Sequence, residues 1–298
     1  LTEKDMADIR VAAECGADFV AGSFVRDAGH VRKLRAALQA EGSEAEIVSK
    51  LEDQEAIRHL DDIIQESDII MVARGDLGIE VHVEELPIIQ RRIVKHCHQL
   101  GRRVIVATHM LESMTENPTP TRAEVTDVSN AVYEEADAIM LSGETTVGKH
   151  PIRCVQLMDR VARRIERSGG LGYGKEATLR TEKQKVIQAA CGLADSIPHA
   201  LIAVFTRSGF TAHQAALLRP RSPIFAFTPQ SSLCSKFTLS RGVRSFKVKF
   251  DEQPRKTIAN AIHFLQQERE LEEGTPIIVV SEIHREGAAV DAILVEHS

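Results

Sequence analysis

Helical and strand patterns alternate five times over the first 167 residues, and this alternation constrains the fold more than any other feature of the chain. The predicted strands are short β-branched runs such as 69–72 and 104–106. Apolar residues at nearly every strand position are typical of parallel strands covered on both faces. Five such units in a row predict a parallel α/β sheet or barrel. The predicted helix and strand pairs are 3–15 and 18–24, 28–38 and 46–52, 54–65 and 68–76, 84–100 and 103–108, and 121–135 and 138–142, closed by a helix at 152–167.

Five strands are too few to close a β/α barrel of the eight-stranded type. Either the sheet is open or three strands of the barrel are missing from this chain. We therefore predict an α/β fold that begins with a partial TIM-type β/α barrel of five parallel strands, in residues 1–168.

A glycine-rich segment at 168–174 has the composition of a flexible linker, and we place the linker at 169–181. The alternation restarts after it, which predicts a second, smaller α/β domain at 182–298. Its predicted helices are 182–197, 212–218, 233–239 and 256–269, and its predicted strands are 201–206, 224–228, 243–248, 276–281 and 292–296.

The composition excludes several classes of protein. A net charge of −6 without a basic block argues against a nucleic-acid binder. There is no run of about 18 apolar residues, so we expect no transmembrane helix and no membrane partner. The five cysteines are scattered singly, which argues against a disulfide framework or a zinc site and favours a reducing, cytoplasmic setting.

Polar residues follow the predicted strands at the ends where parallel barrels carry their reacting groups. Lys50 and Glu52 are two residues apart, so their side chains point to the same side of the sheet. If Ser49 and Leu51 pack outward, the ammonium and the carboxylate face the barrel axis. A buried lysine is costly unless it is paired or takes part in chemistry. A structural salt bridge at the strand end stays open as the alternative.

Asp76 follows the next predicted strand and is flanked by glycines at 75 and 78, which permit tight turns and close approach of a ligand. Mg²⁺ usually takes one or two carboxylates and completes its octahedron with water and substrate phosphate. Glu52 and Asp76 on neighbouring strands therefore predict a Mg²⁺ site. The backbone amides of the Gly75-Asp76 turn suit an anion. A plain loop is the alternative reading.

Hydroxyl and acidic groups follow the remaining strands of the first region. Thr108 ends one strand, and Ser142 and Glu144 repeat the two-residue spacing of the lysine and glutamate above. Each is also compatible with a helix cap or turn. Glu124 lies just after Pro120, in a segment typical of a helix start. The case for a site rests on the meeting of these residues at one barrel mouth.

These segments resemble the pyruvate kinase family, in order and spacing, from the first residue to about residue 167. In the second region, 205–209 and 212–214 followed by Arg219-Pro220 resemble the family's effector loop, and the resemblance fades after about residue 230. The blocks of the first region that carry the resemblance are 49–52, 71–78, 107–114, 120–124 and 140–145.

The resemblance implies the glycolytic transfer of phosphate from phosphoenolpyruvate to ADP, giving pyruvate and ATP, with Mg²⁺ (or Mn²⁺) and K⁺. Lys50 would be the cation against the transferring phosphoryl group, and Glu52 and Asp76 would hold the divalent ion. The amides of Gly75 and Asp76, with the hydroxyl of Thr108, would hold the substrate carboxylate. Phosphoryl transfer asks the protein mainly for positioning and charge neutralisation, which these groups supply.

Two further sets of residues take their roles from the resemblance. Ser142 and Glu144 would belong to the region through which the enolate is protonated. The second set would bind the phosphate of a phosphorylated allosteric effector, although a capped helix start is the alternative there. Relatives are generally tetramers, so a homo-oligomer is expected. The effector residues are Thr206, Arg207, Ser208 and Gly209.

The first three barrel strands and the lid domain of the family have no counterpart in this chain, and they supply the K⁺ ligands and much of the ADP site. We therefore expect little or no pyruvate kinase activity from the chain alone. Two alternatives stay open. The chain could be a non-catalytic effector-binding or assembly fragment of a pyruvate kinase, or another Mg²⁺-dependent barrel enzyme of phosphoenolpyruvate chemistry, such as a lyase.

Overall fold

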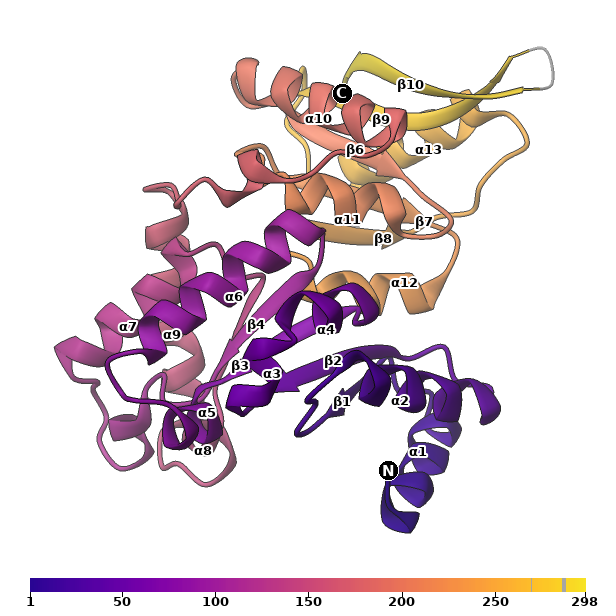
Figure 1. The fold of residues 1–298 in the computed structure, drawn as a ribbon. Coiled ribbons are helices and arrows are strands. Elements are labelled where there is room, and N and C mark those ends of the chain that lie inside the picture. Colours follow the sequence, from indigo (N-terminus) through magenta and orange to yellow (C-terminus); the bar gives the residue numbers. More distant parts are fainter. Residues whose placement is uncertain (269, 286–287) are drawn as a thin grey trace. The chain divides into compact units, whose positions relative to one another are not determined.

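The computed structural model describes residues 1–268, 270–285 and 288–298. The chain forms two compact units, Leu1–Glu176 and Ala177–Ser298, and each contains a five-stranded sheet (Figure 1). The division falls inside the predicted linker at 169–181. Because each unit has its own sheet and core, the two are described separately.

The sheet of the first unit consists of five parallel strands in the order β1-β2-β3-β4-β5. Among the described residues, the outer strands β1 and β5 each pair with one neighbour only, so the sheet is open. The prediction of an α/β fold with five parallel strands, too few to close a barrel, is confirmed. The strands are β1 Phe19–Gly22, β2 Glu46–Leu51, β3 Ile69–Ala73, β4 Arg103–Ala107 and β5 Ala138–Met140.

Helices cover one face of this sheet, and alternate strand residues pack against them. Ile47 and Leu51 of β2, for example, belong to the core that the helices share with the sheet. Val48 and Lys50 alternate with these residues along β2, so their side chains point to the other face. The helices of this unit are α1 Glu3–Glu14, α2 Ala28–Ala40, α3 Gln54–Arg58, α4 Leu60–Glu66, α5 Arg74–Glu80, α6 Leu86–Leu100, α7 Arg122–Tyr133, α8 Gly143–Thr146 and α9 Pro151–Glu166, with short 3₁₀ turns η1 Glu112–Thr115 and η2 Tyr173–Glu176.

Two predicted elements of the first unit differ from the structure. The helix predicted at 54–65 is broken at His59 into α3 and α4. The apolar pattern did not predict this break, because Ala56 and Leu60, on either side of it, are both buried in the same core as in a continuous helix. The strand predicted at 68–76 ends at Ala73, and the expected turn at Gly75-Asp76 is the first turn of α5.

The first part of the predicted linker packs as structured chain within the first unit. Tyr173 is 7% exposed and belongs to the core of that unit. The amides of Gly172 and Gly174 donate hydrogen bonds to the Glu135 carboxylate, at 3.0 and 3.3 Å. Glycine-rich composition predicted flexibility here, but a buried aromatic ring and an acceptor for the backbone amides hold the segment in place.

The second unit has a mixed sheet in the order β10-β9-β6-β7-β8, in which the β9–β10 pair is antiparallel and the other described pairs are parallel. Its strands are β6 Leu201–Phe205, β7 Ile224–Thr228, β8 Val243–Lys247, β9 Pro276–Arg285 and β10 Ala288–His297. Its helices are α10 Glu182–Ser196, α11 Phe210–Leu217, α12 Ser231–Lys236 and α13 Pro254–Gln267, with the 3₁₀ turn η3 Phe237–Leu239. The predicted helix end at residue 269 lies outside the described residues.

Two cores lie on opposite faces of this second sheet. Ile202 and Val204 of β6 pack with residues of α10 and α11, whereas Ala203 and Phe205 pack with residues of α13. Both faces of the sheet are therefore covered, which explains the nearly continuous apolar sequence of β6 and β7. The carboxyl end of β6 leads directly into the turn before α11.

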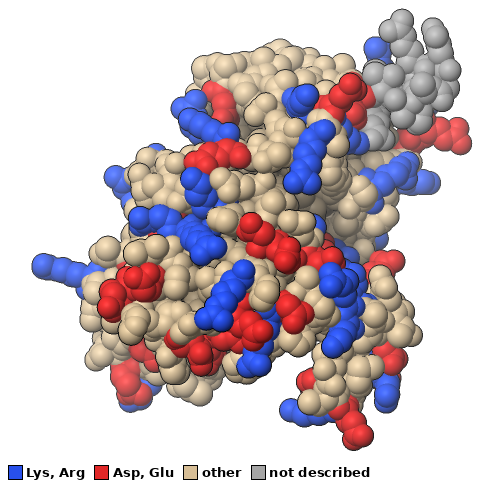
Figure 2. All heavy atoms as spheres, in the orientation of Figure 1, with Lys and Arg blue, Asp and Glu red and all other residues tan. Residues whose placement is uncertain are grey.

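The surface mixes charges of both signs. On the face shown in Figure 2, lysine and arginine side chains alternate with aspartate and glutamate side chains over both units. None of the helices in the described part of the chain is both long and apolar enough to cross a membrane.

Candidate active site

The carboxyl end of β2 holds an ion pair between a partly exposed lysine and a buried glutamate. Lys50 Nζ lies 2.6 Å from Glu52 Oε1, and the two side chains are 26% and 1% exposed. Strand alternation puts them on the face away from the helices, as the two-residue spacing predicted. The pair is therefore built by β2 itself and the residue that follows it.

The loop after β1 completes this pair with two contacts that sequence reasoning missed. The Lys50 ammonium donates to Ser23 Oγ at 2.9 Å, and the Phe24 amide donates to Glu52 Oε2 at 2.6 Å. Phe24 adopts a φ of 51°, in the left-handed region that a bulky side chain rarely occupies. No sequence signal predicts a left-handed phenylalanine, which is why this loop went unnoticed. Backbone strain of this kind concentrates at functional sites.

Glu52 and Asp76 line the same cavity, of about 560 Å³, at this end of the sheet. Five carboxylates and two guanidinium groups line it, so its charge favours a cation. In the described residues there is no cluster of three or more histidine, cysteine, aspartate or glutamate side chains that could hold a metal ion. Two carboxylates are nevertheless the usual protein contribution to a Mg²⁺ site that also binds substrate phosphate. The donor set fits Mg²⁺.

The start of α5 lies against the end of β4. The Gly75 amide donates to Thr108 Oγ1 at 2.8 Å, and the Thr108 hydroxyl donates to the Ala107 carbonyl at 2.6 Å. Thr108 and His109 both have left-handed backbones, with φ of 69° and 52°. The structure thus brings together Gly75 and Thr108, which were predicted to bind one carboxylate, through a direct hydrogen bond.

Arg74 holds these two strand ends together, and sequence reasoning gave it no role. Its guanidinium group, 6% exposed, donates to the carbonyls of Ala107 and Thr108 and forms a 2.7 Å ion pair with Asp127. A further contact reaches Gln90 Oε1 at 3.5 Å. A buried arginine is stable only with such a set of acceptors. Its place directly after a strand was the available signal.

Ser142 and Glu144 lie after β5. They are not among the described residues that line the cavity of Glu52 and Asp76. Glu144 is 1% exposed, and its two oxygens accept the amides of Leu111 and Ser142 at 2.9 and 2.7 Å. These bonds join the loop after β4 to the end of β5. Glu144 thus accepts backbone amides as a helix cap or turn residue does, which was the alternative to a site role.

Glu124 closes the capping box of α7 with Thr121 and also accepts two hydrogen bonds from Ser113, each 2.6 Å long. Burial alone raises the pKa of this carboxyl, but the hydrogen bonds from Ser113 and Thr121 outweigh burial and leave the pKa below its ordinary value. Glu124 therefore fixes the loop before α7 as an ionised side chain.

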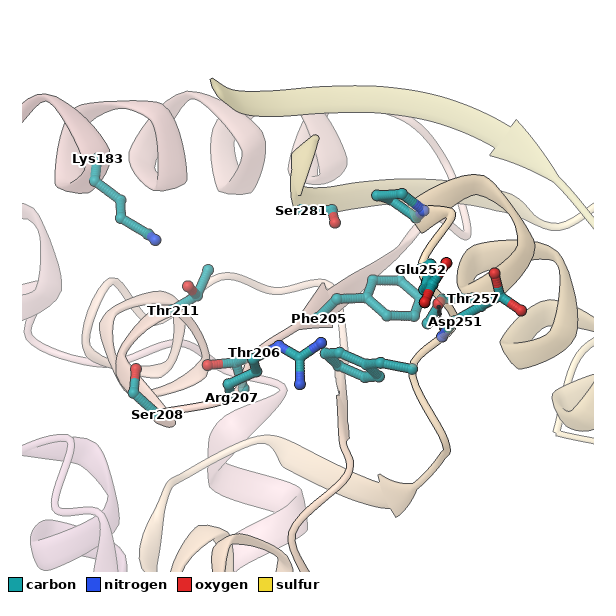
Figure 3. A pocket seen from close by; sticks show the side chains of 12 residues that line it. Lys183, Phe205, Thr206, Arg207, Ser208, Thr211, Asp251, Glu252, Thr257 and Ser281 are labelled. Atoms are coloured by element: carbon teal, nitrogen blue, oxygen red, sulfur yellow. Dashed lines mark hydrogen bonds between the residues drawn. The ribbon is translucent and has the colours of Figure 1, made fainter. Parts of the chain in front are cut away.

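A second cavity, of about 410 Å³, lies in the second unit at the carboxyl end of β6 (Figure 3). Thr206, Arg207 and Ser208 line it, with Lys183 of α10 across the opening. Gly209 is not among the described residues that line it. It is the N-cap of α11 with a φ of 87°, and its amide donates to Thr206 Oγ1 at 2.9 Å.

Aromatic and acidic side chains form the other wall of this second cavity. The Arg207 guanidinium carbon lies 4.9 Å from the centre of the Phe250 ring, a cation–π arrangement. Asp251 and Glu252 precede α13 and face the same space. The wall therefore offers acceptors for hydroxyl groups opposite donors for a phosphate.

Comparison with known proteins identifies the family of the chain. Residues 1–155 match the family model for the barrel domain of pyruvate kinase, and residues 184–295 match the model for its alpha/beta domain.

Individual relatives of the chain carry the same family name as the two models. The chain is 39% identical to plastidial pyruvate kinase 2 of Arabidopsis thaliana over 283 residues, which cover 94% of this chain and 49% of the relative. It is 42% identical to a pyruvate kinase of Corynebacterium efficiens over 246 residues, covering 83% and 52%. A pyruvate kinase of Sporosarcina psychrophila is 44% identical over 251 residues, covering 82% and 42%. The chain thus spans about half the length of these relatives. It belongs to the pyruvate kinase family.

Proposed function

We propose that this chain carries the phosphoryl-transfer centre of a pyruvate kinase, in which phosphate passes from phosphoenolpyruvate to ADP and yields pyruvate and ATP. One observation carries the proposal: Glu52 and Asp76 line a single cavity, and Lys50 lies 2.6 Å from Glu52. A cation beside two carboxylates is the arrangement that phosphoryl transfer requires. The names of the relatives support the reaction.

Lys50 acts as the cation against the transferring phosphoryl group. Its ammonium is held by Glu52 and Ser23 and is partly exposed, so it remains available to a substrate. A compact ammonium suits a group that moves during the reaction, because it interacts as a point charge without a fixed fork geometry. Glu52 holds this ammonium in place.

Glu52 and Asp76 would hold Mg²⁺ or Mn²⁺. The ion, when bound, neutralises charge on the substrate phosphate. Glu52 is fixed by the Phe24 amide, whereas Asp76 is exposed on the first turn of α5. One ligand is therefore held rigidly and the other is free to adjust. The K⁺ requirement is proposed from the family alone.

Gly75, Asp76 and Thr108 would bind the carboxylate of the substrate. The amide of Gly75 and the hydroxyl of Thr108 bond to each other in the structure, so a carboxylate would exchange these contacts for its own. Such an exchange replaces one acceptor by a charged one, which strengthens the hydrogen bond. Arg74 keeps the two backbone segments in register while it occurs.

Ser142 would belong to the region that protonates the enolate, with Glu144 as a positioning residue. In the described part of the chain the Ser142 hydroxyl makes no hydrogen bond, so it is available to a substrate or a water molecule. Glu144 fixes the amide of Ser142 and with it the direction of this turn. We therefore propose that the Ser142 hydroxyl, and not the Glu144 carboxylate, takes part in the proton transfer.

For the second unit we propose binding of a phosphorylated effector in the cavity of Thr206, Arg207 and Ser208. The cavity offers a guanidinium group and two hydroxyls to a phosphate. The domain limits 1–168, 169–181 and 182–298, a homo-oligomeric assembly and a cytoplasmic setting also remain proposals. One relative is named as plastidial.

Two measurements test the proposed centre. A coupled assay with phosphoenolpyruvate, ADP, Mg²⁺ and K⁺ should show little or no turnover by the chain alone, because it spans about half of its relatives. Electron paramagnetic resonance should detect Mn²⁺ binding that weakens at least about tenfold in Glu52→Gln and Asp76→Asn. Asp62→Asn, at an exposed position of α4, is the matched control and should bind as the parent does. Equal Mn²⁺ affinity in all variants would refute the metal assignment.

A further inference from the structure

A third cavity, of about 310 Å³, lies in the first unit between α9 and the segment 118–120, apart from the residues assigned above. Its floor is apolar: Met114 is 1% exposed, and Leu157 packs against the core of the unit. Pro118 and Pro120 form one wall, where their rings fix the backbone. The base of the cavity is therefore formed by side chains packed in or against the core of the unit.

One face of α9 forms the opposite wall. Arg153, Gln156, Leu157 and Arg160 follow one another at helical spacings of three, four and seven residues, so their side chains lie on the same face. The stems of the two arginines can lie over Leu157 while their guanidinium groups reach the rim. The helix therefore presents two cations, with an amide between them, toward the prolines.

The charge of this cavity is opposite to that of the cavity lined by Glu52 and Asp76. Two guanidinium groups and no carboxylate are among the described residues that line it. Two acids close in sequence to its lining residues pair with other cations: Asp159 with Arg163 at 2.8 Å, and Glu116 with Lys149. Over the described residues, Arg153 and Arg160 form no ion pair.

We propose that this cavity binds a phosphate group, either inorganic phosphate or the phosphate of a small monoester. Two guanidinium groups match the two negative charges of a phosphate and its planar pairs of oxygens. The Gln156 amide and the Thr119 hydroxyl supply further donors. The volume is at the lower end of ligand pockets, which suits a small molecule.

Because phosphate also suits the cavity of Thr206, Arg207 and Ser208, the test must report on these two arginines. A spectrum of the arginine Nε–Hε groups is recorded during titration with inorganic phosphate and, separately, with glycerol phosphate, at constant ionic strength. Arg153→Gln and Arg160→Gln assign the two signals. Both signals should shift together and saturate with a Kd of about 1 mM or tighter for at least one of the probes.

Variants provide the second half of the test. Arg153→Gln should weaken binding at the Arg160 signal at least about tenfold, since one of two charge-assisted contacts is lost. Arg167→Gln removes the same charge from the end of the same helix, outside the cavity, and should leave the affinity unchanged. Linear, unsaturated shifts, or equal losses in Arg153→Gln and Arg167→Gln, would show a general electrostatic effect and overturn the site.

Discussion

Lys50 Nζ and Glu52 Oε1 lie 2.6 Å apart, and this contact joins a lysine side chain that is 26% exposed to a carboxylate that is 1% exposed. A buried carboxylate without a partner is strongly destabilising, so the lysine supports the fold as well as the proposed chemistry. Loss of activity in a Lys50 variant is therefore informative only together with its stability.

Lys50→Met should lower the free energy of unfolding by roughly 3 kcal/mol, because it leaves the Glu52 charge buried with only the Phe24 amide to stabilise it. The double variant Lys50→Met with Glu52→Gln should recover much of this loss, since no unpaired charge remains. Urea titration of the first unit measures both values. Lys33→Met, at an exposed position of α2, serves as the control. If the double variant proved no more stable than Lys50→Met, the ion pair would not be the source of the effect.

Glu124 should make the stability of the first unit depend on acid pH. Its folded pKa lies below the ordinary value of 4.5, so its hydrogen bonds stabilise the fold fully above pH 4.5. The contribution is lost as pH falls through the folded pKa. Urea titrations should therefore show a gap between the parent and Glu124→Gln at neutral pH that narrows below pH 4.5. A gap that widened in acid would contradict the direction of the shift.

The five cysteines should differ sharply in reactivity toward a thiol reagent such as Ellman's. Burial raises the pKa of Cys191 to about 12 and raises that of Cys97 well above its usual value, so neither forms thiolate readily. Cys15 is exposed and should react at once. Cys97 and Cys191 should react only after unfolding. Substitution of Cys15 by serine should abolish the fast phase, and fast labelling that survives it at Cys97 would contradict the structure.

Two glycines should respond oppositely to substitution by alanine. A Cβ at Gly148 would clash with the Glu144 carbonyl oxygen, so Gly148→Ala forces the turn after α8 to move and should destabilise the fold. A Cβ at Gly192, within α10, meets no atom within 4 Å, so Gly192→Ala should stabilise by roughly 0.5–1 kcal/mol. Thermal unfolding of both variants checks the signs. Equal effects would mean that the Gly148 turn is looser than described.

The sequence predicted the backbone of the first unit well, for a physical reason. Strands β3 and β4 are apolar at every position except Arg103, and such short runs rich in β-branched residues are typical of buried strands. Because Lys50 and Glu52 are two residues apart, strand alternation alone predicted that their side chains lie on the same face.

What the sequence did not reveal depends on contacts between distant segments. The left-handed backbone of Phe24, which completes the Lys50–Glu52 pair, has no local signal. The Glu144 carboxylate accepts a hydrogen bond from the amide of Leu111, which lies in another loop. The glycine-rich segment at 169–174 reads as flexible because its acceptor, Glu135, lies far away along the chain.

Calorimetry of phosphoenolpyruvate binding tests the central claim most directly, because it needs neither ADP nor turnover. We predict binding to the parent chain in the presence of Mg²⁺, loss of that binding on chelation, and weakening of at least about tenfold in Lys50→Met and Asp76→Asn. Variants Lys33→Met and Asp62→Asn should match the parent. If Lys50, Asp76 and the metal ion act on one substrate, all three losses should occur together. Binding that is indifferent to the metal, to Lys50 and to Asp76 would contradict the account.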